Sequence, residues 1–407
     1  MSTNKTVGKD NLYLRIGTDY YKKVQQPLFS GDTFNTLNKW KKGEIITDEG
    51  KEYLDGIKKY DGFCNIPSHT DYQKEINHFY NEYEELDFKL EEGSYVKTEL
   101  YLKHIFGDHY SLGLDYLSIL WKYPTQILPI LCLVSNERNT GKTTFLKWLK
   151  FIFQGNMTIN KNEDFRSRFN SDWSSKLIVS VDEVLLDKKE DSERIKNLST
   201  ASSYKTESKG VDKVESFFFG KFILCSNNEE NFIYVDDKEI RYWVLKVPSF
   251  KTEEPDLLEV LKNEIPFFVN FINKRKIISG KKTRMWFTKE QIHTEALNKL
   301  IKGKKSSLSS ELKEILKDEF VKFEVDELKY SAGDLVQLLF KNNVRIRLSE
   351  VTEVLKNSFE LESTNGSYSK YHLAIMPKDN TYITEKTTWK GRYYTFIKSE
   401  LNSKEEC

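Results

Sequence analysis

The apolar positions of the chain alternate between two patterns, one typical of buried strands and one typical of helices. Short continuous apolar runs, of the kind found in strands buried on both faces, occur at residues 127–134, 177–181, 217–225 and 242–247. Helical stretches lie between the first three of these runs. This alternation predicts an α/β architecture with a parallel sheet, which we place in residues 123–275.

The segments before this core divide into two. From residue 72 to residue 121, apolar side chains recur at three- and four-residue steps, which predicts a small helical domain over residues 61–122. Residues 1–60 are polar with scattered aromatic side chains, and their pattern assigns no fold.

The segments after the core predict a linker and a further domain. Basic, turn-rich stretches mark residues 276–307 as a linker. Helical patterns and then an extended segment with a polar turn follow at residues 311–320, 332–341, 348–359 and 361–376. Three helices and a hairpin in this order predict a winged helix over residues 308–401, ahead of a frayed tail at 402–407. Residues 348–359 would form the recognition helix and 363–370 the wing of a module that contacts either duplex DNA or a protein.

The charge balance restricts where a polyanion could bind. The chain has 63 Lys and Arg residues against 62 Asp and Glu residues, a formal net charge of +1. This balance excludes a protein whose whole surface is basic, so any site for a polyanion must be local. The amino terminus has no apolar signal region, and no stretch approaches the roughly 18 apolar residues of a spanning helix. We therefore expect a soluble cytoplasmic protein without a membrane partner.

The cysteine pattern argues against zinc and disulfides. The four cysteines are scattered and form no C-x-x-C pair: Cys64, Cys132, Cys225 and Cys407. Cys132 and Cys225 lie in apolar runs, where a thiol serves as a small hydrophobe.

The strongest chemical signal directly follows the first apolar run. A polar loop leads into an amphipathic helix through Asn136, Glu137, Arg138, Asn139, Thr140, Gly141, Lys142, Thr143 and Thr144. A phosphate-binding loop needs this order, because N–H groups at a helix start point at the phosphates while a lysine reaches their oxygens and a hydroxyl holds Mg²⁺. Lys142 and Thr143 fit the last two roles. Asn136 replaces the first glycine of the usual pattern, and asparagine tolerates a left-handed backbone. The simpler alternative is a helix start at which Gly141 merely turns the chain.

Acidic and amide residues follow the next two apolar runs. Asp182 and Glu183 end the second run, and suit a magnesium ligand and a general base that orients the attacking water. Asn227 follows the third run, where an amide can hydrogen-bond the γ-phosphate or the water. The alternatives are solvated acids at a strand end and a plain Asn-Asn turn.

The order of these features resembles that of superfamily 3 helicases. More narrowly, residues 60–376 or so are similar to the helicase half of phage and plasmid primase-helicases, which are related to the poxvirus primase-helicase. The resemblance implies an AAA+ P-loop NTPase core that binds ATP and Mg²⁺, with an N-terminal helical region and a C-terminal winged-helix domain.

Two further sites follow from the resemblance. The loop between the second and third runs matches the family's hairpin that grips nucleic acid, with contacts from Lys205, Lys209 and Lys213. The alternative is a solvated turn, because neighbouring acids cancel these charges. Arg241, just before the fourth run, matches the arginine that completes the ATP site of the neighbouring subunit. Its alternative is a salt bridge to Glu239 or Asp237.

The resemblance therefore implies an ATP-driven DNA helicase of a phage or mobile element, which unwinds duplex DNA during replication as a ring, by expectation a hexamer. Its catalytic residues would be Lys142, Glu183, Asn227 and Arg241. The expected partners are single-stranded and forked DNA and a separate primase or polymerase, in a host bacterial cytoplasm. No D-x-D motif occurs in the chain, so we expect no primer synthesis. The alternatives are an AAA+ switch in regulation or phage defence that separates no strands, and a DNA-binding module with a dead nucleotide site.

Overall fold

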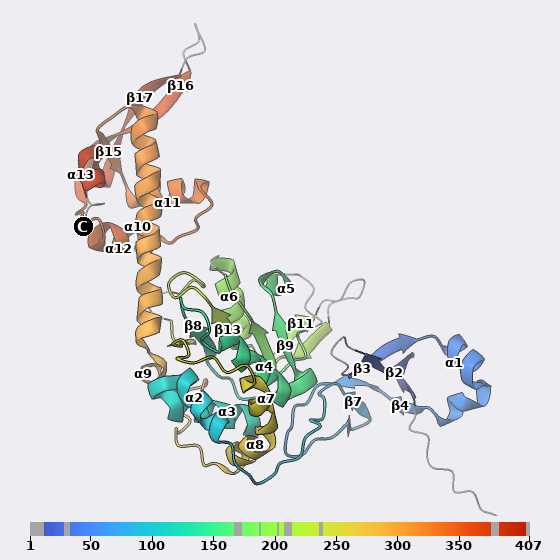
Figure 1. Cartoon of the computed structure of the whole chain (residues 1–407). Helices are drawn as coiled ribbons and strands as arrows, with labels where there is room; N and C mark the ends of the chain where they lie inside the picture. Colours follow the sequence, from blue (N-terminus) through green and yellow to red (C-terminus); the bar gives the residue numbers. More distant parts are fainter. Residues whose placement is uncertain are drawn as a thin grey trace, which may run out of the picture. The chain divides into compact units, whose positions relative to one another are not determined.

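The computed structural model divides the chain into two compact units (Figure 1). The first unit comprises Met1–Val184, Arg194–Asn227 and Arg241–Ile292, and the second comprises Leu185–Glu193, Asn228–Ile240 and His293–Cys407. The structure describes residues 12–27, 33–166, 173–186, 189–201, 203–206, 214–235, 239–375 and 382–403.

The amino-terminal segment, to which the sequence assigned no fold, forms a four-stranded sheet in the order β3-β2-β1-β4. Its elements are β1 (Tyr13–Ile16), β2 (Asp19–Pro27), β3 (Thr33–Trp40), α1 (Lys42–Glu49), η1 (Lys51–Gly56) and β4 (Lys58–Tyr60). Side chains alternate across the strands, so Tyr13 packs with Ile45 and Ile57, whereas Leu14 and Ile16 pack on the opposite face. Both faces of β1 are therefore covered.

The predicted helical domain over residues 61–122 is wrong in its first part. Residues 62–81 contain three short strands, and helices begin only at residue 96: β5 (Gly62–Cys64), β6 (Glu75–Ile76), β7 (Phe79–Asn81), α2 (Val96–Phe106), η2 (Gly107–His109) and α3 (Tyr110–Lys122). Asn77 and His78 have positive φ angles of 48° and 67°, which turn the chain between β6 and β7. Apolar side chains spaced across this turn imitate the spacing of a helix.

His69 fastens the segment before β6 to the core of the first unit. Its Nδ1 lies 2.7 Å from the Trp121 carbonyl oxygen, and its Nε2 lies 2.6 Å from the Tyr83 hydroxyl. A carbonyl only accepts, so Nδ1–H donates to it and Nε2 accepts from the tyrosine. The imidazole also stacks on Trp121, with centroids 4.5 Å apart. Burial lowers the pKa of His69 from 6.5 to about 4.

The free energy of unfolding should consequently fall in mild acid. Between pH 6.5 and about 4 the unfolded chain binds a proton that the folded His69 does not, so stability is present above this window and is lost as the pH drops through it. The expected loss is about 3 kcal/mol. Denaturant unfolding across this window would measure it, with His69→Asn as the control that keeps a donor for the Trp121 carbonyl but does not titrate. Equal pH profiles for the two proteins would contradict the prediction.

The predicted α/β core with a parallel sheet is confirmed. Five parallel strands lie in the order β14-β8-β13-β10-β9. They are β8 (Ile130–Val134), β9 (Met157–Asn160), β10 (Ile178–Val181), β13 (Lys221–Ser226) and β14 (Tyr242–Lys246). Every residue of β8, β10 and β13 is buried, which explains their continuous apolar runs. Strand β9, at the sheet edge, has a mixed burial pattern and gave no such run.

Helices supply the rest of the first unit's core. Those described are α4 (Lys142–Phe153), α5 (Asn162–Arg166), α7 (Leu257–Asn263), α8 (Ile265–Lys274) and α9 (Lys289–Ile292), and α6 (Lys189–Leu198) continues into this unit. A single cluster of buried side chains joins α2, α3, α4 and α8 to the sheet, with Trp148 and Trp243 among its largest members.

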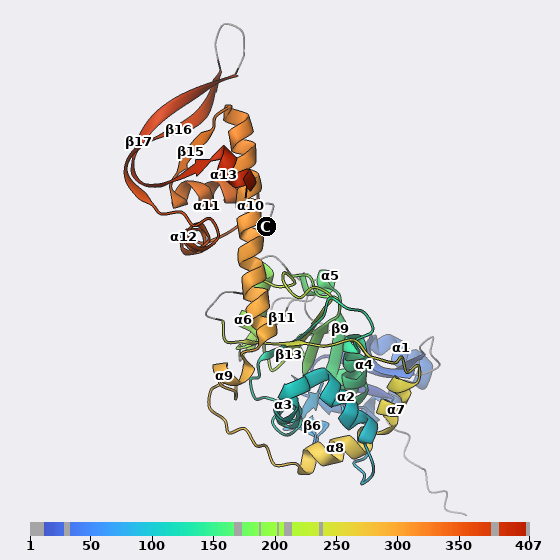
Figure 2. The same cartoon turned by 60° about the vertical axis from the view of Figure 1, so that its left-hand side comes forward.

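The second unit consists of a long helix, a three-stranded sheet and shorter helices (Figure 2). Its elements are α10 (Glu295–Phe323), β15 (Glu327–Tyr330), α11 (Ala332–Lys341), α12 (Leu348–Asn357), β16 (Thr364–Ile375), β17 (Tyr382–Ile397) and α13 (Lys398–Ser403). The strand order is β15-β17-β16, with antiparallel pairing. The helices predicted at residues 332–341 and 348–359 are present, and α11 starts with a capping box between Ser331 and Asp334.

The predicted linker over residues 276–307 is wrong at its carboxyl-terminal end, because α10 runs through Gly303 without a break. Thr294 caps this helix by accepting a hydrogen bond from the Leu297 amide at 3.1 Å. A glycine inside a helix costs only about 1 kcal/mol. A Cβ atom at Gly303 would lie 2.6 Å from Cβ of Glu230, so this glycine permits a close approach of two segments and does not end the helix.

Candidate nucleotide site

The carboxyl ends of the parallel strands form the edge at which the predicted site residues gather. β8 and β13 are neighbours, but the chain leaves β8 towards β9 at one edge of the sheet and leaves β13 towards β14 on the other side of β8. Neighbouring strands whose connections diverge in this way open the crevice in which α/β sheets bind ligands. The loop after β8, the end of β10 and the end of β13 all border this position.

Helix α2 holds the loop that follows β8. The Tyr101 hydroxyl donates a hydrogen bond to the Gly141 carbonyl at 2.8 Å, and His104 Nε2 lies 3.1 Å from the Thr140 carbonyl oxygen. These two side chains stand three residues apart on one helix face. The sequence revealed them only as part of a helical pattern, because nothing local indicates that they would contact the loop.

Phe250, from the segment after β14, holds the same loop from a second direction. Its amide donates to the Asn139 carbonyl at 2.9 Å, and its ring stacks on His104 with centroids 4.1 Å apart. A Cβ atom at Gly141 would lie 2.9 Å from the Phe250 ring, so only glycine fits there without a shift. The loop is therefore fixed before any ligand binds.

The amide groups of the loop fit an anion. Among the residues that the structure describes, none accepts a hydrogen bond from the N–H of Asn139, Thr140 or Gly141. Asn139 and Gly141 have φ angles of 54° and 84°, a left-handed conformation that can turn neighbouring N–H groups towards one anion. Helix α4 begins at the next residue, so the amino-terminal end of a helix, which attracts anions, directly follows the loop. The asparagine that uses the left-handed backbone is thus Asn139, and the expectation for Asn136 was wrong.

The start of α4 reaches the end of β10 through a side-chain hydrogen bond. The Thr143 hydroxyl donates to Oδ2 of Asp182 at 3.0 Å. A hydroxyl and a carboxylate are oxygen ligands of the kind that Mg²⁺ prefers. Lys142, immediately before, is only 6% exposed, and its Nζ lies 3.0 Å from the Thr140 hydroxyl. The structure therefore brings together the loop, the lysine and the two predicted magnesium ligands.

Glu183 has an unusual backbone. Its φ angle is 54°, which a side chain as long as glutamate rarely adopts and which costs about 1–3 kcal/mol. Neighbouring contacts hold it in place: the Asn162 side-chain amide donates to the Glu183 carbonyl at 3.2 Å, and the Val184 amide donates to the Cys225 carbonyl at 2.7 Å. The Glu183 side chain is exposed at the site edge. Strain of this kind concentrates at functional sites.

Asn227 lies beside the loop through the pairing of β13 with β8. The Ser135 amide donates to the Ser226 carbonyl at 3.2 Å, so the next residue, Asn227, emerges at the same edge, and its side chain is exposed. Asn228 makes the plain turn that the sequence left open, because its Oδ1 accepts from the amides of Glu230 and Asn231 at 2.8 Å each.

Arg241 lies at the amino ends of the strands, opposite the carboxyl ends that border the loop. It precedes β14, and its carbonyl accepts from the Ile130 amide at 2.8 Å where β8 begins. β14 runs parallel to β8, so about five residues of strand, or about 17 Å, separate Arg241 from the loop edge. Within one chain, Arg241 is thus not brought to Thr143 and Asp182.

The predicted DNA-gripping loop falls between two paired strands. β11 (Ser203–Thr206) and β12 (Val214–Phe217) are antiparallel, and Lys205 lies opposite Glu215 in their register. Lys209 and Lys213 lie outside the residues that the structure describes. Residues 203–206 and 214–217 therefore pair as two antiparallel strands.

Comparison with known proteins adds a likeness of fold. A model of a family of unknown function (DUF5906) matches residues 133–241. No curated protein matches the chain. Among solved structures, the apo C-terminal region of NrS-1 (residues 305–718) is 13% identical with a TM-score of 0.57, and 95% of each chain is covered. An A form of the apo NrS-1 C-terminal region is 14% identical with a TM-score of 0.56, covering 95% of this chain and 96% of that one. The chain shares the fold of the NrS-1 C-terminal region.

The fold shared with the NrS-1 C-terminal region extends over nearly the whole chain, whereas the DUF5906 match is confined to β8 through Arg241. That match contains the loop after β8, the Asp182-Glu183 pair and Asn227. Over the described part of the chain, no helix is long and apolar enough to cross a membrane.

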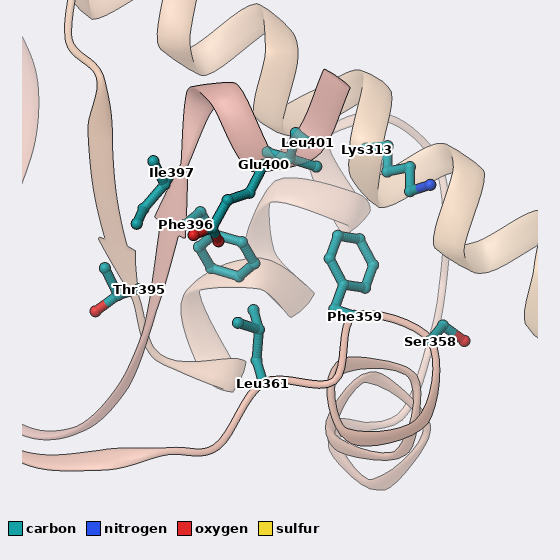
Figure 3. A pocket seen from close by; sticks show the side chains of 9 residues that line it. All are labelled: Lys313, Ser358, Phe359, Leu361, Thr395, Phe396, Ile397, Glu400 and Leu401. Carbon is teal, nitrogen blue, oxygen red and sulfur yellow. The ribbon is translucent and has the colours of Figure 1, made fainter. Parts of the chain in front are cut away.

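The second unit has a pocket of different character (Figure 3). Apolar side chains surround it, including Phe359, Leu361 and Phe396, with Lys313 and Glu400 beside them. Among the described residues of the chain, no three His, Cys, Asp or Glu side chains gather as a metal-binding group. The pocket therefore offers apolar contact, and the candidates for phosphate chemistry lie in the first unit.

Proposed function

We propose that the chain is an ATP-dependent DNA helicase of the superfamily 3 type, from a phage or mobile element, which unwinds duplex DNA during replication as a homo-oligomeric ring. The hydrogen bond between Thr143 and Asp182 carries this proposal. It places a hydroxyl at a helix start against a carboxylate at a strand end, beside a loop whose amide groups are open to an anion. That combination suits a nucleoside triphosphate with its magnesium ion.

Each residue of the site has a role in this scheme. The amides of Asn139, Thr140 and Gly141 bind the β-phosphate. The Lys142 ammonium group, which lies beside the Thr140 hydroxyl, binds the phosphate oxygens. Thr143 and Asp182 would hold Mg²⁺, which when bound neutralises charge on the phosphate oxygens. Tyr101, His104 and Phe250 are positioning residues, because they fix the loop through its carbonyl groups.

The remaining roles concern water, the neighbouring subunit and DNA. Glu183 accepts a proton from the attacking water, and Asn227 hydrogen-bonds the γ-phosphate. Arg241 reaches the ATP site of the next subunit, since its edge of the sheet lies away from its own site. Residues 203–217 grip one DNA strand through Lys205, Lys209 and Lys213. In the second unit, the order of α10, β15, α11, α12, β16 and β17 suits a winged helix.

An AAA+ switch in regulation or phage defence is the rival function, because the same site could drive assembly. The two differ in one observable. The helicase separates a forked duplex in the presence of ATP, whereas the switch hydrolyses ATP and leaves the fork intact. A strand-displacement assay on a forked DNA therefore decides between them.

Lys142→Ala is expected to reduce the rate of ATP hydrolysis by about 100- to 1,000-fold, because it removes the cation that stabilises charge on the transferring phosphoryl group. DNA-stimulated phosphate release measures the effect. Lys147→Ala is the matched control, since Lys147 is exposed on the same helix. Full DNA-stimulated hydrolysis by the Lys142→Ala protein would overturn the assignment of the nucleotide site.

A further inference from the structure

The strands β16 and β17 form a ribbon that extends beyond the sheet of the second unit. They pair from Thr364 with Tyr393 to Ile375 with Tyr382, whereas β15 pairs only with residues 394–397 of β17. The paired stretch of β16 and β17 is therefore two-stranded. Figure 2 shows its curved course. Successive side chains alternate between its two faces.

One face of the ribbon packs on the unit itself. Tyr368 is buried, and Lys370 forms an ion pair with Asp334 at the start of α11, with Nζ 2.6 Å from Oδ1. The Trp389 ring, opposite Tyr368 in the register, lies 3.9 Å from the Lys370 ammonium group. The Lys370 cation of this face is thus already paired within the protein.

Over the described residues of β16 and β17, the opposite face carries cations and no acid. In the register, its described positions are Asn365, Ser367, Ser369, Tyr371, Leu373 and Ile375 on β16, and Tyr382, Thr384, Lys386, Thr388, Lys390 and Arg392 on β17. Lys386, Lys390 and Arg392 are all exposed. We call these three side chains the ribbon cations. Ser367 lies opposite Lys390 in the register, and Asn365 lies opposite Arg392.

The ribbon cations have little to hold them within the protein. Among the described residues, neither Lys390 nor Arg392 has a hydrogen bond or an ion pair, and Lys386 lies 5.2 Å from the ring of Tyr371. Six residues of strand separate Lys386 from Arg392, which is about 20 Å. A row of cations of this length spans about six phosphates along one strand of DNA, at about 3.4 Å per nucleotide.

Helix α12, the predicted recognition helix, is a poorer surface for DNA. It contains Glu350 and Glu353 but only one cation, Lys356. Glu350 is engaged locally, because its carboxylate accepts from the Arg347 amide at 3.0 Å and from the Tyr234 hydroxyl. A helix of net negative charge is repelled by the phosphates that flank the major groove.

We propose that the ribbon cations form a second nucleic-acid site, which binds the phosphate backbone of duplex DNA without reading its sequence. Duplex is favoured over single-stranded DNA because single strands require exposed aromatic side chains among the cations. This face has two aromatic side chains, and neither lies between the cations. Tyr371 stacks on Phe323 with centroids 5.9 Å apart, and Tyr382 is exposed but lies four residues beyond Lys386, at the end of the strand away from Lys390 and Arg392. The inference goes beyond the proposed helicase function and does not depend on the nucleotide site.

The test compares two double variants of the full chain with the same loss of charge. Lys390→Gln/Arg392→Gln changes the ribbon, and Lys341→Gln/Lys356→Gln removes two exposed cations from α11 and α12. Binding of a blunt, labelled DNA duplex is measured by fluorescence anisotropy without nucleotide, between about 50 and 200 mM salt. The ribbon variant should bind at least about tenfold more weakly at the low salt concentration, and its slope of log affinity against log salt should fall by about 1.8.

Further measurements separate this site from others. The charge-preserving variant Lys390→Arg/Arg392→Lys should bind duplex as the unaltered chain does, and the ribbon variant should retain ATP hydrolysis. An equal loss in the Lys341→Gln/Lys356→Gln variant would assign the effect to net charge or to α12 and would overturn the proposal. So would unchanged duplex binding by the ribbon variant, or an equal loss of affinity for an unstructured single strand.

Discussion

Arg241→Ala is expected to lower the rate of ATP hydrolysis by about 1,000-fold or more while leaving ATP binding nearly unchanged. An arginine that stabilises transition-state charge from a neighbouring subunit is worth about 10³–10⁵ in rate. Arg241 lies at the edge of the sheet where β8 and β14 begin, whereas Thr143 and Asp182 lie at the opposite edge. Its effect should therefore be exerted on another subunit. Arg284→Ala, which removes an exposed arginine, is the control.

Mixing two inactive proteins distinguishes action between subunits from action within one. Arg241→Ala chains keep Glu183, and Glu183→Gln chains keep Arg241. In rings assembled at random from equal amounts, about one interface in four joins an intact Glu183 to an intact Arg241 from the neighbour. Mixed rings should thus regain about a quarter of the unaltered hydrolysis rate. No recovery in rings that demonstrably mix would place the action of Arg241 within its own chain.

Glu183→Gln is expected to reduce hydrolysis by about 100- to 10,000-fold, because the amide cannot accept a proton from the attacking water. The change is nearly isosteric, so the strained backbone at φ 54°, the hydrogen bond from Asn162 to its carbonyl and the hydrogen bond from Val184 to Cys225 should persist. ATP should still bind, and the protein should accumulate in its ATP-bound form. Single-turnover hydrolysis together with equilibrium binding of labelled ATP separates these effects.

The control for this change is Glu163→Gln, which neutralises an exposed carboxylate on the neighbouring helix α5. It should leave both binding and hydrolysis unchanged. If Glu183→Gln lowered ATP affinity and hydrolysis in equal proportion, Glu183 would contribute to binding, and its role as a general base would be wrong.

The sequence predicted the elements whose burial is uniform. β8, β10 and β13 are buried along their whole length, so each left a continuous apolar run. It failed where local patterns were ambiguous. The turn at Asn77 and His78 separates two short strands that imitate a helix, and Gly303 lies inside α10 because of a contact with Glu230, 73 residues earlier in the chain.

The charge balance of the whole chain illustrates a similar limit. A net charge of +1 restricted any polyanion site to a local patch but did not locate it. The ribbon cations are not consecutive in the sequence of β17. Thr387, Thr388 and Trp389 separate Lys386 from Lys390, and Gly391 separates Lys390 from Arg392. Only the register with β16 reveals that they share one face of the ribbon, which carries no acid among the described residues.

The sequence by itself determined the order of the chemical groups: a G-K-T helix start at Gly141, an acidic pair at Asp182 and Glu183, an amide at Asn227 and an arginine at Arg241. Such motifs are local, because each depends on a few consecutive residues at a strand end. The tertiary structure alone decided which of them meet. The order of strands in the sheet brings Thr143 to Asp182 and places Arg241 at the far edge, because strand order is set by packing between segments distant in the chain.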